Sequence, residues 1–458
     1  MYRNYSYNNT ANMKNLKHYA LLLLCVLATL GTASCSDDNN DDNPSTPTNE
    51  RQDGQMGAIV KQYVNTVVLP TYADLASASI DLRDACAQLY QKRAAGQLTQ
   101  ADIDKACDAF KKARRQWEQS EAFLYGAATD NDIDPHIDSW PLDQAQLADA
   151  LTSQTVIAGI TGSNPGQFVY TSNTNFDSTM GFHGLEFVLF RSGKNRTLAA
   201  FTAEREDGAD ITNAQNRTKL QTVTTLQEAA FAAAVSQDLA NMTCLLEYGW
   251  AGDAIAQSHK AVLDAAPWTI NALRYKGLSS AGIAYGAWYT SNDKDKCAFQ
   301  TWHETLQNVF VGGCSNICQE VFTQKLGQAY RVATGQAEEE DAGDYIESPY
   351  SKRSFQDYQD NIYSIKNSLY GLRGTESVSQ PAATSILAFL RDNGYEGYND
   401  LRTAIDQAVS ALETAKNSGR AFIDAPGDAQ VGKCIDAVSR LDSELQKAGT
   451  WINRVSDK

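Results

Sequence analysis

Apolar side chains recur along most of this chain at spacings of three and four residues, the period of one face of an α-helix. One such stripe consists of Ile103, Cys107, Phe110, Arg114, Trp117, Glu121 and Leu124. The chain shows neither strand–helix alternation nor an internal repeat of about 20–50 residues. The sequence therefore predicts an all-α fold.

The length of the chain predicts how these helices are grouped. A single core rarely grows beyond about 250–300 residues, and this chain has 458. We therefore expect two helical-bundle halves with a pocket between them: residues 55–235 as an N-terminal helical half and residues 236–458 as a C-terminal helical bundle. Thr99, with Asp102 three residues later, should start one helix, and Gly371 should end another.

The N-terminal segment has the composition of an export signal. Basic Lys14 and Lys17 precede an apolar run from Tyr19 to Leu30, which is too short to span a bilayer. The residues Thr32-Ala33-Ser34-Cys35 resemble the lipobox of bacterial lipoproteins. We therefore expect residues 1–35 to be a signal peptide with Cys35 as the lipidated residue, although a plain signal peptide cut near Ala33 is the alternative.

Residues 36–54 contain mostly Asp, Asn, Pro, Ser and Thr, a composition typical of a disordered tether. The leader has three basic and no acidic side chains, so 36 of the 39 basic residues remain against 55 acidic ones, a net charge near −19. Such a surface repels nucleic acid and anionic lipid. We expect an exported protein at the outer membrane or cell surface, which contacts the membrane through its lipid anchor only.

Seven cysteines remain after the leader and Cys35, an odd and scattered set that does not indicate a disulfide framework. Cys86 and Cys107 should face inward on successive antiparallel helices, where a bridge could form. Cys314 and Cys318 could bind a metal with His303, but buried helical cysteines are the commoner explanation of this spacing.

Two charged residues interrupt the apolar stripe of residues 103–124. Arg114 and Glu121 occupy positions that should face the core, and buried charges are costly unless they are paired. They indicate either an ion-pair network between helices or side chains that face a ligand.

The segment Gly181-Phe182-His183-Gly184-Leu185-Glu186 is the sharpest local motif. His183 and Glu186 are three residues apart on a helix, so that an imidazole and a carboxylate could converge on one ion. Gly181 and Gly184 are poor helix formers, which suggests that another group approaches this backbone closely. A core histidine beside a surface glutamate would explain the same spacing without an ion.

Three segments resemble one known family. GFHGLEFVLF (Gly181–Phe190) resembles the Gly-x-His-x-x-Glu signature of the imelysin family. ARRQWEQSEAFLYG (Ala113–Gly126) with IDSWPLD (Ile137–Asp143) resembles its first block, and ESPYSKRSFQDYQDNIYSIKNSLYG (Glu347–Gly371) its late block. The resemblance implies an exported two-part helical fold with a pocket where the halves meet.

The resemblance also implies which residues form that pocket. His183 and Glu186 would be the metal-binding residues; the other ligand-binding residues would be Arg114, Trp117, Glu121, Asp138, Trp140, Ser351, Asp357 and Asn361. Lys352 stands where some relatives are expected to carry histidine, which weakens the case for a metal ligand from the late block. Asp357 and Asn361 share one helical face, and a composite site requires the Asp357 carboxylate within roughly 15 Å of the His183 ring.

The resemblance leaves three classes of function open. The family is named after a peptidase, but a catalytic zinc takes three protein ligands, and a third ligand beside His183 and Glu186 would have to be His136, His259 or His303. Relatives also occur in iron-uptake systems, so a binding role with iron or zinc as ligand, and with partner proteins of unknown identity, is our leading expectation. A metal-free binding protein for a small organic or peptide ligand is the third class.

Overall fold

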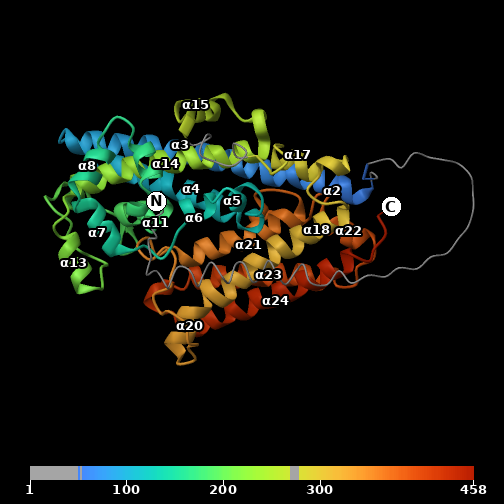
Figure 1. Ribbon diagram of the computed structural model, residues 1–458. Helices are drawn as coiled ribbons and strands as arrows, with labels where there is room; N and C mark the ends of the chain where they lie inside the picture. The colour runs from blue at the N-terminus through green and yellow to red at the C-terminus, as the bar shows by residue number, and fades with distance from the viewer. Residues whose placement is uncertain (1–49, 52–53, 269–277, 458) are drawn as a thin grey trace, which may run out of the picture. The chain divides into compact units, whose positions relative to one another are not determined.

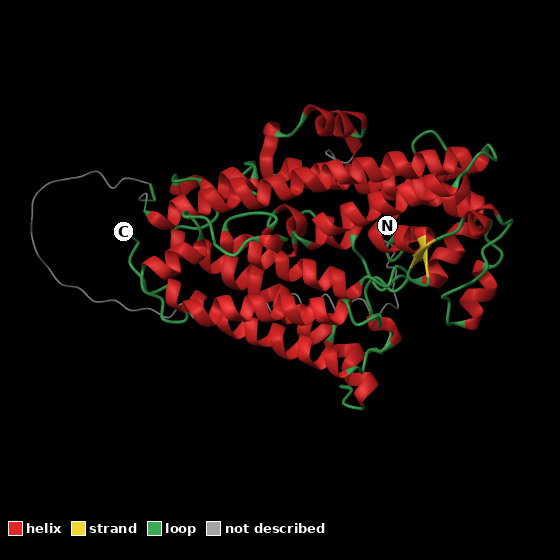
Figure 2. Cartoon of the chain, turned by 180° about the vertical axis from the view of Figure 1, so that it is seen from behind, coloured by secondary structure: helices red, strands yellow, loops and turns green. Residues whose placement is uncertain are grey.

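The protein is described by a computed structural model that covers residues 50–51, 54–268 and 278–457. The predicted signal peptide, Cys35 and most of the predicted tether lie outside the described residues. About 69% of the chain is helical, and among the described residues the sheet consists of one short hairpin (Figure 2). The prediction of an all-α fold is confirmed.

The first part of the described chain contains two long helices, a series of short ones and a hairpin. Its elements are α2 (Gln55–Tyr63), η1 (Val64–Val68), α3 (Leu69–Ala94), α4 (Gln100–Glu118), η2 (Glu121–Phe123), α5 (Ala127–Asp130), α6 (Ile133–Ile137), α7 (Gln144–Thr152), α8 (Gln154–Ile160), α9 (Pro165–Thr171), α10 (Asn173–Phe176), α11 (Gly181–Leu189), β1 (Phe190–Arg191), β2 (Lys194–Asn195), α12 (Leu198–Thr202) and α13 (Ala214–Leu220). The segment 126–176 contains six short helices, α5 to α10.

The second part begins with the longest helix. Its elements are α14 (Thr225–Ala251), η3 (Gly252–Ala254), α15 (Gln257–Ala265), α17 (Tyr285–Thr290), η5 (Lys294–Lys296), α18 (Trp302–Gln307), η6 (Asn308–Ser315), α19 (Asn316–Gln319), η7 (Glu320–Lys325), α20 (Gly327–Thr334), α21 (Ser354–Tyr370), η8 (Thr375–Ser377), α22 (Ile386–Asp392), α23 (Tyr398–Lys416), η9 (Phe422–Asp424) and α24 (Ala429–Ile452).

The long helices of residues 49–458 form two layers. In one layer α3 packs between α14 and α4, and in the other α23 packs between α21 and α24 (Figure 1). The layers meet where α21 contacts α4 and η2. The boundary expected between residues 235 and 236 falls inside α14, because that stretch contains no proline, and no glycine before Gly249, to interrupt the helix.

The helix ends predicted from sequence are found where local chemistry favours them. Thr99 and Asp102 form a capping box at the start of α4, and Gly371 ends α21 in the left-handed conformation with φ 65°. The helix expected to continue to Leu124 ends at Glu118 instead. The hydroxyl of Ser120 donates to the carbonyl of Trp117 at 2.6 Å, which competes with the helical pattern there.

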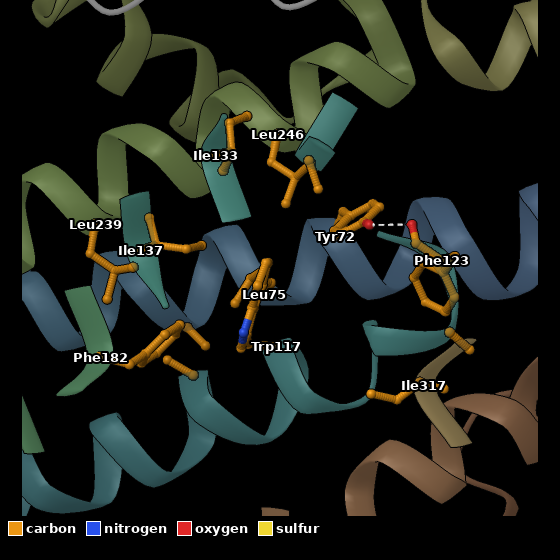
Figure 3. Packing of buried hydrophobic residues seen from close by; sticks show 14 of the residues in the cluster. Tyr72, Leu75, Trp117, Phe123, Ile133, Ile137, Phe182, Leu239, Leu246 and Ile317 are labelled. Atoms are coloured by element: carbon orange, nitrogen blue, oxygen red, sulfur yellow. Dashed lines mark hydrogen bonds between the residues drawn. The ribbon is translucent and has the colours of Figure 1, made fainter. Parts of the chain in front are cut away.

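The apolar core extends through both layers. Around α3 it includes Tyr72, whose hydroxyl donates to the carbonyl of Phe123 at 2.9 Å (Figure 3). One helical segment, Thr225–Ala254, is long and apolar enough to cross a membrane, but 89% of its most apolar window is buried within the protein. Such burial is typical of a core helix.

One residue of the predicted tether, Arg51, contacts the helical core. Arg51, expected to be disordered, is buried and donates from Nε to the carbonyl of Ser291 at 2.9 Å and from Nη2 to that of Tyr289 at 3.1 Å. Its guanidinium lies 3.6 Å from the centre of the Trp302 ring. These long-range contacts provide the apolar and polar partners that local composition does not reveal.

All seven cysteines of residues 50–458 that the sequence left unassigned are free and buried. Cys86 and Cys107 face the core as expected but form no bridge, and the thiol of Cys107 donates to the carbonyl of Leu189. Cys314 and Cys318 lie in η6 and α19, while His303 Nε2 donates to the carbonyl of Val455 at 2.7 Å. These cysteines are core residues of the helices.

Candidate functional site

The candidate site is centred on Arg114, which is fully buried on α4. Its guanidinium contacts Glu118 one turn later at 2.5 Å and also contacts Asp138 and Glu347. Its Nε lies 3.5 Å from an oxygen of Asp357. Four carboxylates from three segments of the chain thus surround the guanidinium. Arg114, the first of the two charged residues that interrupt the apolar stripe, is therefore part of an ion-pair network between helices.

Asp138 connects this guanidinium to the histidine of the Gly-x-His-x-x-Glu motif. One Asp138 oxygen contacts Arg114 and lies 3.1 Å from Nε2 of His183, and the other accepts a hydrogen bond from the Trp117 indole at 2.7 Å. Nδ1 of His183 lies 3.8 Å from Glu186. Asp357 and His183 are therefore separated by only two intervening side chains, as a composite site requires.

Both predicted glycines of the motif are held against protein backbone. Gly181 begins α11 with φ 73°, and a Cβ there would lie 2.0 Å from the carbonyl oxygen of Ile137. At Gly184 a Cβ would lie 1.9 Å from the carbonyl oxygen of Thr179. The close approach is that of neighbouring backbone, and it places α11 directly beside the segment that carries Asp138.

Glu186 is fixed by the late block of the sequence. The backbone amide and the hydroxyl of Ser351 both donate to one Glu186 oxygen at 2.7 Å. The other oxygen of Glu186 is buried without a hydrogen-bond partner. The motif therefore has one anchored carboxylate oxygen and one that remains available on the side of His183.

The α21 residues predicted to share a face both point toward α4. Asp357 accepts a hydrogen bond from the Ser348 hydroxyl at 2.5 Å. Asn361 donates from Nδ2 to Glu118 at 2.5 Å, while its side-chain oxygen has no hydrogen-bond partner. This helix thus packs with its apolar stripe and presents its polar residues to the site.

Lys325, at the end of η7, is a second buried cation that sequence reasoning missed. Its ammonium lies 3.1 Å from Glu347, 3.7 Å from Glu320 and 4.0 Å from Glu121. The signal was present, since Cys314, Cys318, Val321 and Lys325 follow a helical spacing in which lysine takes a core position. Glu121 therefore also has a cationic neighbour, but the distance of 4.0 Å to Lys325 is longer than the 2.5 Å between Arg114 and Glu118.

We refer to these side chains together as the central acidic cluster. Its members are Arg114, Glu118, Glu121, Asp138, His183, Glu186, Glu320, Lys325, Glu347 and Asp357. Glu118 and Glu347 were also missed, although Glu118 stands four residues after Arg114 and Glu347 begins the late block.

Trp140 forms a partly exposed aromatic edge of the cluster. Its ring centre lies 4.1 Å from that of Tyr345 and 6.4 Å from that of His183, and the Lys325 ammonium lies 5.7 Å from it. Trp140 precedes a cis proline, Pro141. Trp140 and Tyr345 are partly exposed, whereas most members of the central acidic cluster are buried.

Burial and neighbouring charges shift the protonation of the cluster strongly. Burial disfavours an imidazolium, but the contacts of His183 with Asp138 and Glu186 outweigh it and raise the pKa of His183 to about 9. Burial likewise opposes ionisation of Asp138, yet Arg114 and His183 hold its pKa well below the usual range. Burial raises the pKa of Glu121 well above its ordinary value.

Two groups of donors within the cluster could hold a cation. The atoms of Asp138, His183 and Glu347 lie within 4.8 Å of one another, and so do those of Glu118, Glu121 and Asp138. The three histidines considered as a third ligand lie elsewhere: His136 pairs with Asp238, His259 with Glu247, and His303 with the Val455 carbonyl. Carboxylates, not a further histidine, therefore complete the donor set.

Two further observations delimit the site. Lys352 forms an exposed ion pair with Asp424 at 2.8 Å, so it takes no part in the cluster. A surface groove of about 660 Å³ lies along α21 and α23, where its lining includes Gln359, Tyr363 and Glu413. None of the ten residues predicted for the site lines this groove.

Comparisons with known proteins agree with the three-block resemblance. The profile of the family described as Imelysin (Peptidase_M75) matches residues 68–445. Iron-regulated protein A from Synechococcus elongatus is 31% identical over 131 residues, which cover 29% of this chain and 31% of that protein. The similarity thus spans about a third of the length of this relative.

Solved structures share the fold. A protein described as an iron-regulated protein A precursor from Parabacteroides distasonis matches with a TM-score of 0.65 and 24% identity, over 88% of this chain and 96% of that one. An imelysin-like protein from Psychrobacter arcticum matches with a TM-score of 0.50 and 14% identity, over 85% of this chain and 92% of that one.

Proposed function

Since the chain belongs to the imelysin family, we propose that it binds a metal cation in the central acidic cluster, with iron as the leading ligand and zinc as the next. Asp138, His183 and Glu347 would be the first donors, and Glu186 adjoins them. The proposal is one of binding, without catalysis.

The observation that carries this proposal is the charge balance of the cluster. Seven carboxyl groups face three basic groups, Arg114, His183 and Lys325; Arg353, at 3.8 Å from Asp357, adds a fourth at the edge. A buried surplus of carboxylates is costly when ionised, so burial raises the pKa of Glu118, Glu121 and Asp357, and the excess carboxyl groups bind protons unless a cation replaces them. A bound cation would compensate this surplus directly.

The donor chemistry fits iron and zinc. Imidazole and carboxylate are common ligands of both ions, and helical bundles build iron sites from glutamate and histidine on facing helices. Buried Oε2 atoms of Glu186 and Glu347 have no hydrogen-bond partner among the described residues, but that of Glu347 lies 3.1 Å from the Lys325 ammonium. The Glu186 oxygen is therefore the one that remains available to a further ligand. The names of the Synechococcus and Parabacteroides proteins refer to regulation by iron, which makes iron the first ion to test.

Burial favours a small ligand over a large one. His183 is 2% exposed and Glu347 is fully buried, so a polypeptide segment could not reach them without rearrangement of the loops around Trp140 and Tyr345. This favours ion capture over a metal-dependent peptidase of the imelysin type and over a binding protein for an organic or peptide ligand. Both alternatives are outcomes of the experiment below.

The experiment compares two histidine–aspartate pairs, one buried and one partly buried. His183 lies 3.1 Å from Asp138 inside the cluster, and His136 lies 2.6 Å from Asp238 outside it. Protein purified without chelators should contain, or take up from added Fe²⁺ or Zn²⁺, about one ion per chain. His183→Ala should lose that ion, whereas His136→Ala should retain it.

Other results would replace the proposal. Equal metal content in the wild type and His183→Ala would remove the cluster as the metal site, and absence of uptake by the wild type would favour a metal-free ligand. Chelator-sensitive cleavage of unfolded polypeptides that is lost in both His183→Ala and Glu186→Gln would establish the peptidase alternative.

We also propose that the protein acts as an exported lipoprotein, held at the outer membrane or cell surface by lipid on Cys35. The support comes from the sequence of residues 14–42, which lie outside the described residues. The variant Cys35→Ser should leave the membrane fraction or accumulate unprocessed. A processed variant that stays membrane-bound would contradict this location.

A further inference from the structure

Three residues outside the central acidic cluster form a connected chain of contacts between helices. Nε2 of His259, on α15, lies 2.9 Å from the hydroxyl oxygen of Ser77, on α3. Nδ1 of the same ring lies 2.6 Å from a carboxylate oxygen of Glu247, on α14. A serine, a histidine and a carboxylate are thus within hydrogen-bonding distance in the order of a nucleophile, its base and the group that orients the base.

The partners fix the roles of the two ring nitrogens. An ionised carboxylate only accepts hydrogen bonds, so Nδ1 of a neutral His259 carries its proton toward Glu247. Nε2 is then the acceptor, and the Ser77 hydroxyl donates to it. This tautomer of the neutral ring is the one that can remove a proton from serine.

The serine of this chain of contacts is accessible to solvent, as a nucleophile must be, and its two partners are buried. His259 is 4% and Glu247 is 3% exposed, whereas Ser77 is solvent-exposed. Figures 1 and 2 show α15 beside the α3–α14 pair, on the side opposite to α21, α23 and α24. A reagent in solution can reach the serine, while the groups that would activate it are held in place by packing.

We propose that Ser77, His259 and Glu247 form a nucleophilic triad that accepts acyl groups from esters with good leaving groups. No residue of the triad belongs to the central acidic cluster, so this activity is separate from cation binding.

The reaction balances with the ester and water as the only reactants. Ser77 Oγ attacks the carbonyl carbon while its proton moves to Nε2 of His259, and the carbonyl electron pair moves onto oxygen. When that pair returns, the bond to the leaving group breaks and the leaving oxygen takes the proton from Nε2. Water then attacks the acyl-serine while its proton moves to Nε2 of His259. The bond between the acyl carbon and Ser77 Oγ breaks, Oγ takes the proton from Nε2, and the carboxylic acid leaves.

The position of Ser77 limits the substrates. It lies within α3, where backbone amides are engaged in hydrogen bonds to carbonyls four residues earlier. These amides cannot stabilise an oxyanion, and loss of one such donor typically costs about 100- to 1,000-fold in rate. Ser77 should therefore be acylated by aryl esters and phosphonylated, with loss of fluoride, by fluorophosphonates, whereas amides should remain intact.

The test is covalent labelling of the whole protein with a fluorophosphonate, followed by peptide mass mapping. We expect a single adduct on Ser77 and release of nitrophenol from p-nitrophenyl acetate that depends on this residue. Ser77→Ala should abolish the adduct and should fold, because alanine favours helix. Glu247→Gln and His259→Gln should slow labelling, the latter by about 100-fold or more, the usual contribution of a general base.

Ser258→Ala is the matched control, because Ser258 is an exposed serine next to His259 on the same helix. It should label at the wild-type rate. No adduct on Ser77, or an equal labelling rate in His259→Gln that retains the wild-type circular dichroism spectrum, would show that the three residues only tie α15 to α3 and α14.

Discussion

Two clusters of buried charge in this protein differ in their balance. Arg191, Arg196, Glu206 and Glu228 form a square in which each guanidinium contacts both carboxylates, at 2.8 to 3.5 Å. The central acidic cluster instead gathers seven carboxyl groups around three basic ones.

The difference separates two explanations that residue type alone cannot distinguish. In the square, two guanidinium groups face two carboxyl groups, and the hydrogen bonds link the β1–β2 hairpin to α14, which suits a structural network. Burial opposes ionisation of Glu206, but Arg191 and Arg196 outweigh it and lower its pKa to about 2, whereas burial raises the pKa of Glu228 to about 8. In the central acidic cluster the surplus remains, and compensation must come from protons or from a bound cation.

Breaking the balanced square should have the largest effect on stability. Arg196→Met leaves Glu206 and Glu228 with one guanidinium between them, and removal of one partner from a buried ion pair typically costs about 3–5 kcal/mol. Urea unfolding measures the loss, while metal content should remain at the wild-type level. Lys112→Met, which removes an exposed pair with Asp81, is the control and should not change the unfolding free energy measurably. If Arg196→Met also loses metal, the square of arginines and glutamates contributes to metal binding and is not purely structural.

Metal should stabilise the protein through the unbalanced cluster. At a free metal concentration about 100 times Kd, binding to the folded state alone adds about 2.7 kcal/mol to the free energy of unfolding. Chemical denaturation with and without Fe²⁺ or Zn²⁺ should show this gain in the wild type and in Lys112→Met. His183→Ala should show none; an equal gain in that variant would place the ion elsewhere.

The pH dependence of metal affinity should follow His183. With a pKa raised to about 9, the imidazole is protonated at neutral pH, and it must lose that proton before it can bind metal. Affinity should therefore rise about tenfold per pH unit up to pH 9 and level off above it. Calorimetric titrations between pH 6 and 8 would measure the slope and the released proton. A flat profile would exclude His183 as a ligand.

Removing one carboxyl group from the central acidic cluster should have the smallest effect. Burial raises the pKa of Glu121 well above its usual value, which favours its neutral form, and Lys325 retains Glu347 at 3.1 Å. Glu121→Gln should change the free energy of unfolding by no more than about 1 kcal/mol in either direction. A loss as large as that of Arg196→Met in the same urea experiment would mean that Glu121 is ionised and structurally required.

Several site residues could be predicted because they violate a local pattern. Arg114 and Glu121 interrupt an apolar stripe, and His183 lies in a helix with two glycines, so each stands out against its neighbours in sequence. Asp357 and Asn361 could be placed on one helical face because they are four residues apart. Lys325 violates its stripe in the same way, and it could have been found by the argument that found Arg114.

The partners of these residues could not be predicted. Glu347 meets Arg114 across 233 positions of sequence, and Ser351 meets Glu186 across 165. Such pairs depend on how α4, α11 and α21 pack, which no spacing within one helix encodes. The peptidase alternative would have needed a third ligand from a distant histidine, whereas the predicted Asp138 and the unpredicted Glu347 lie next to His183.

The sequence by itself determined the helical class, the capped ends of α4 and α21, and the presence of charge on faces that must be buried. These properties follow from side chains within a few residues of one another, where helix geometry fixes the neighbours. Only the tertiary structure decided which carboxylates meet which cations, that one cluster is balanced and the other is not, and that Ser77 meets His259. Charge compensation and burial are sums over contacts between distant segments, so they become defined only when the helices have packed.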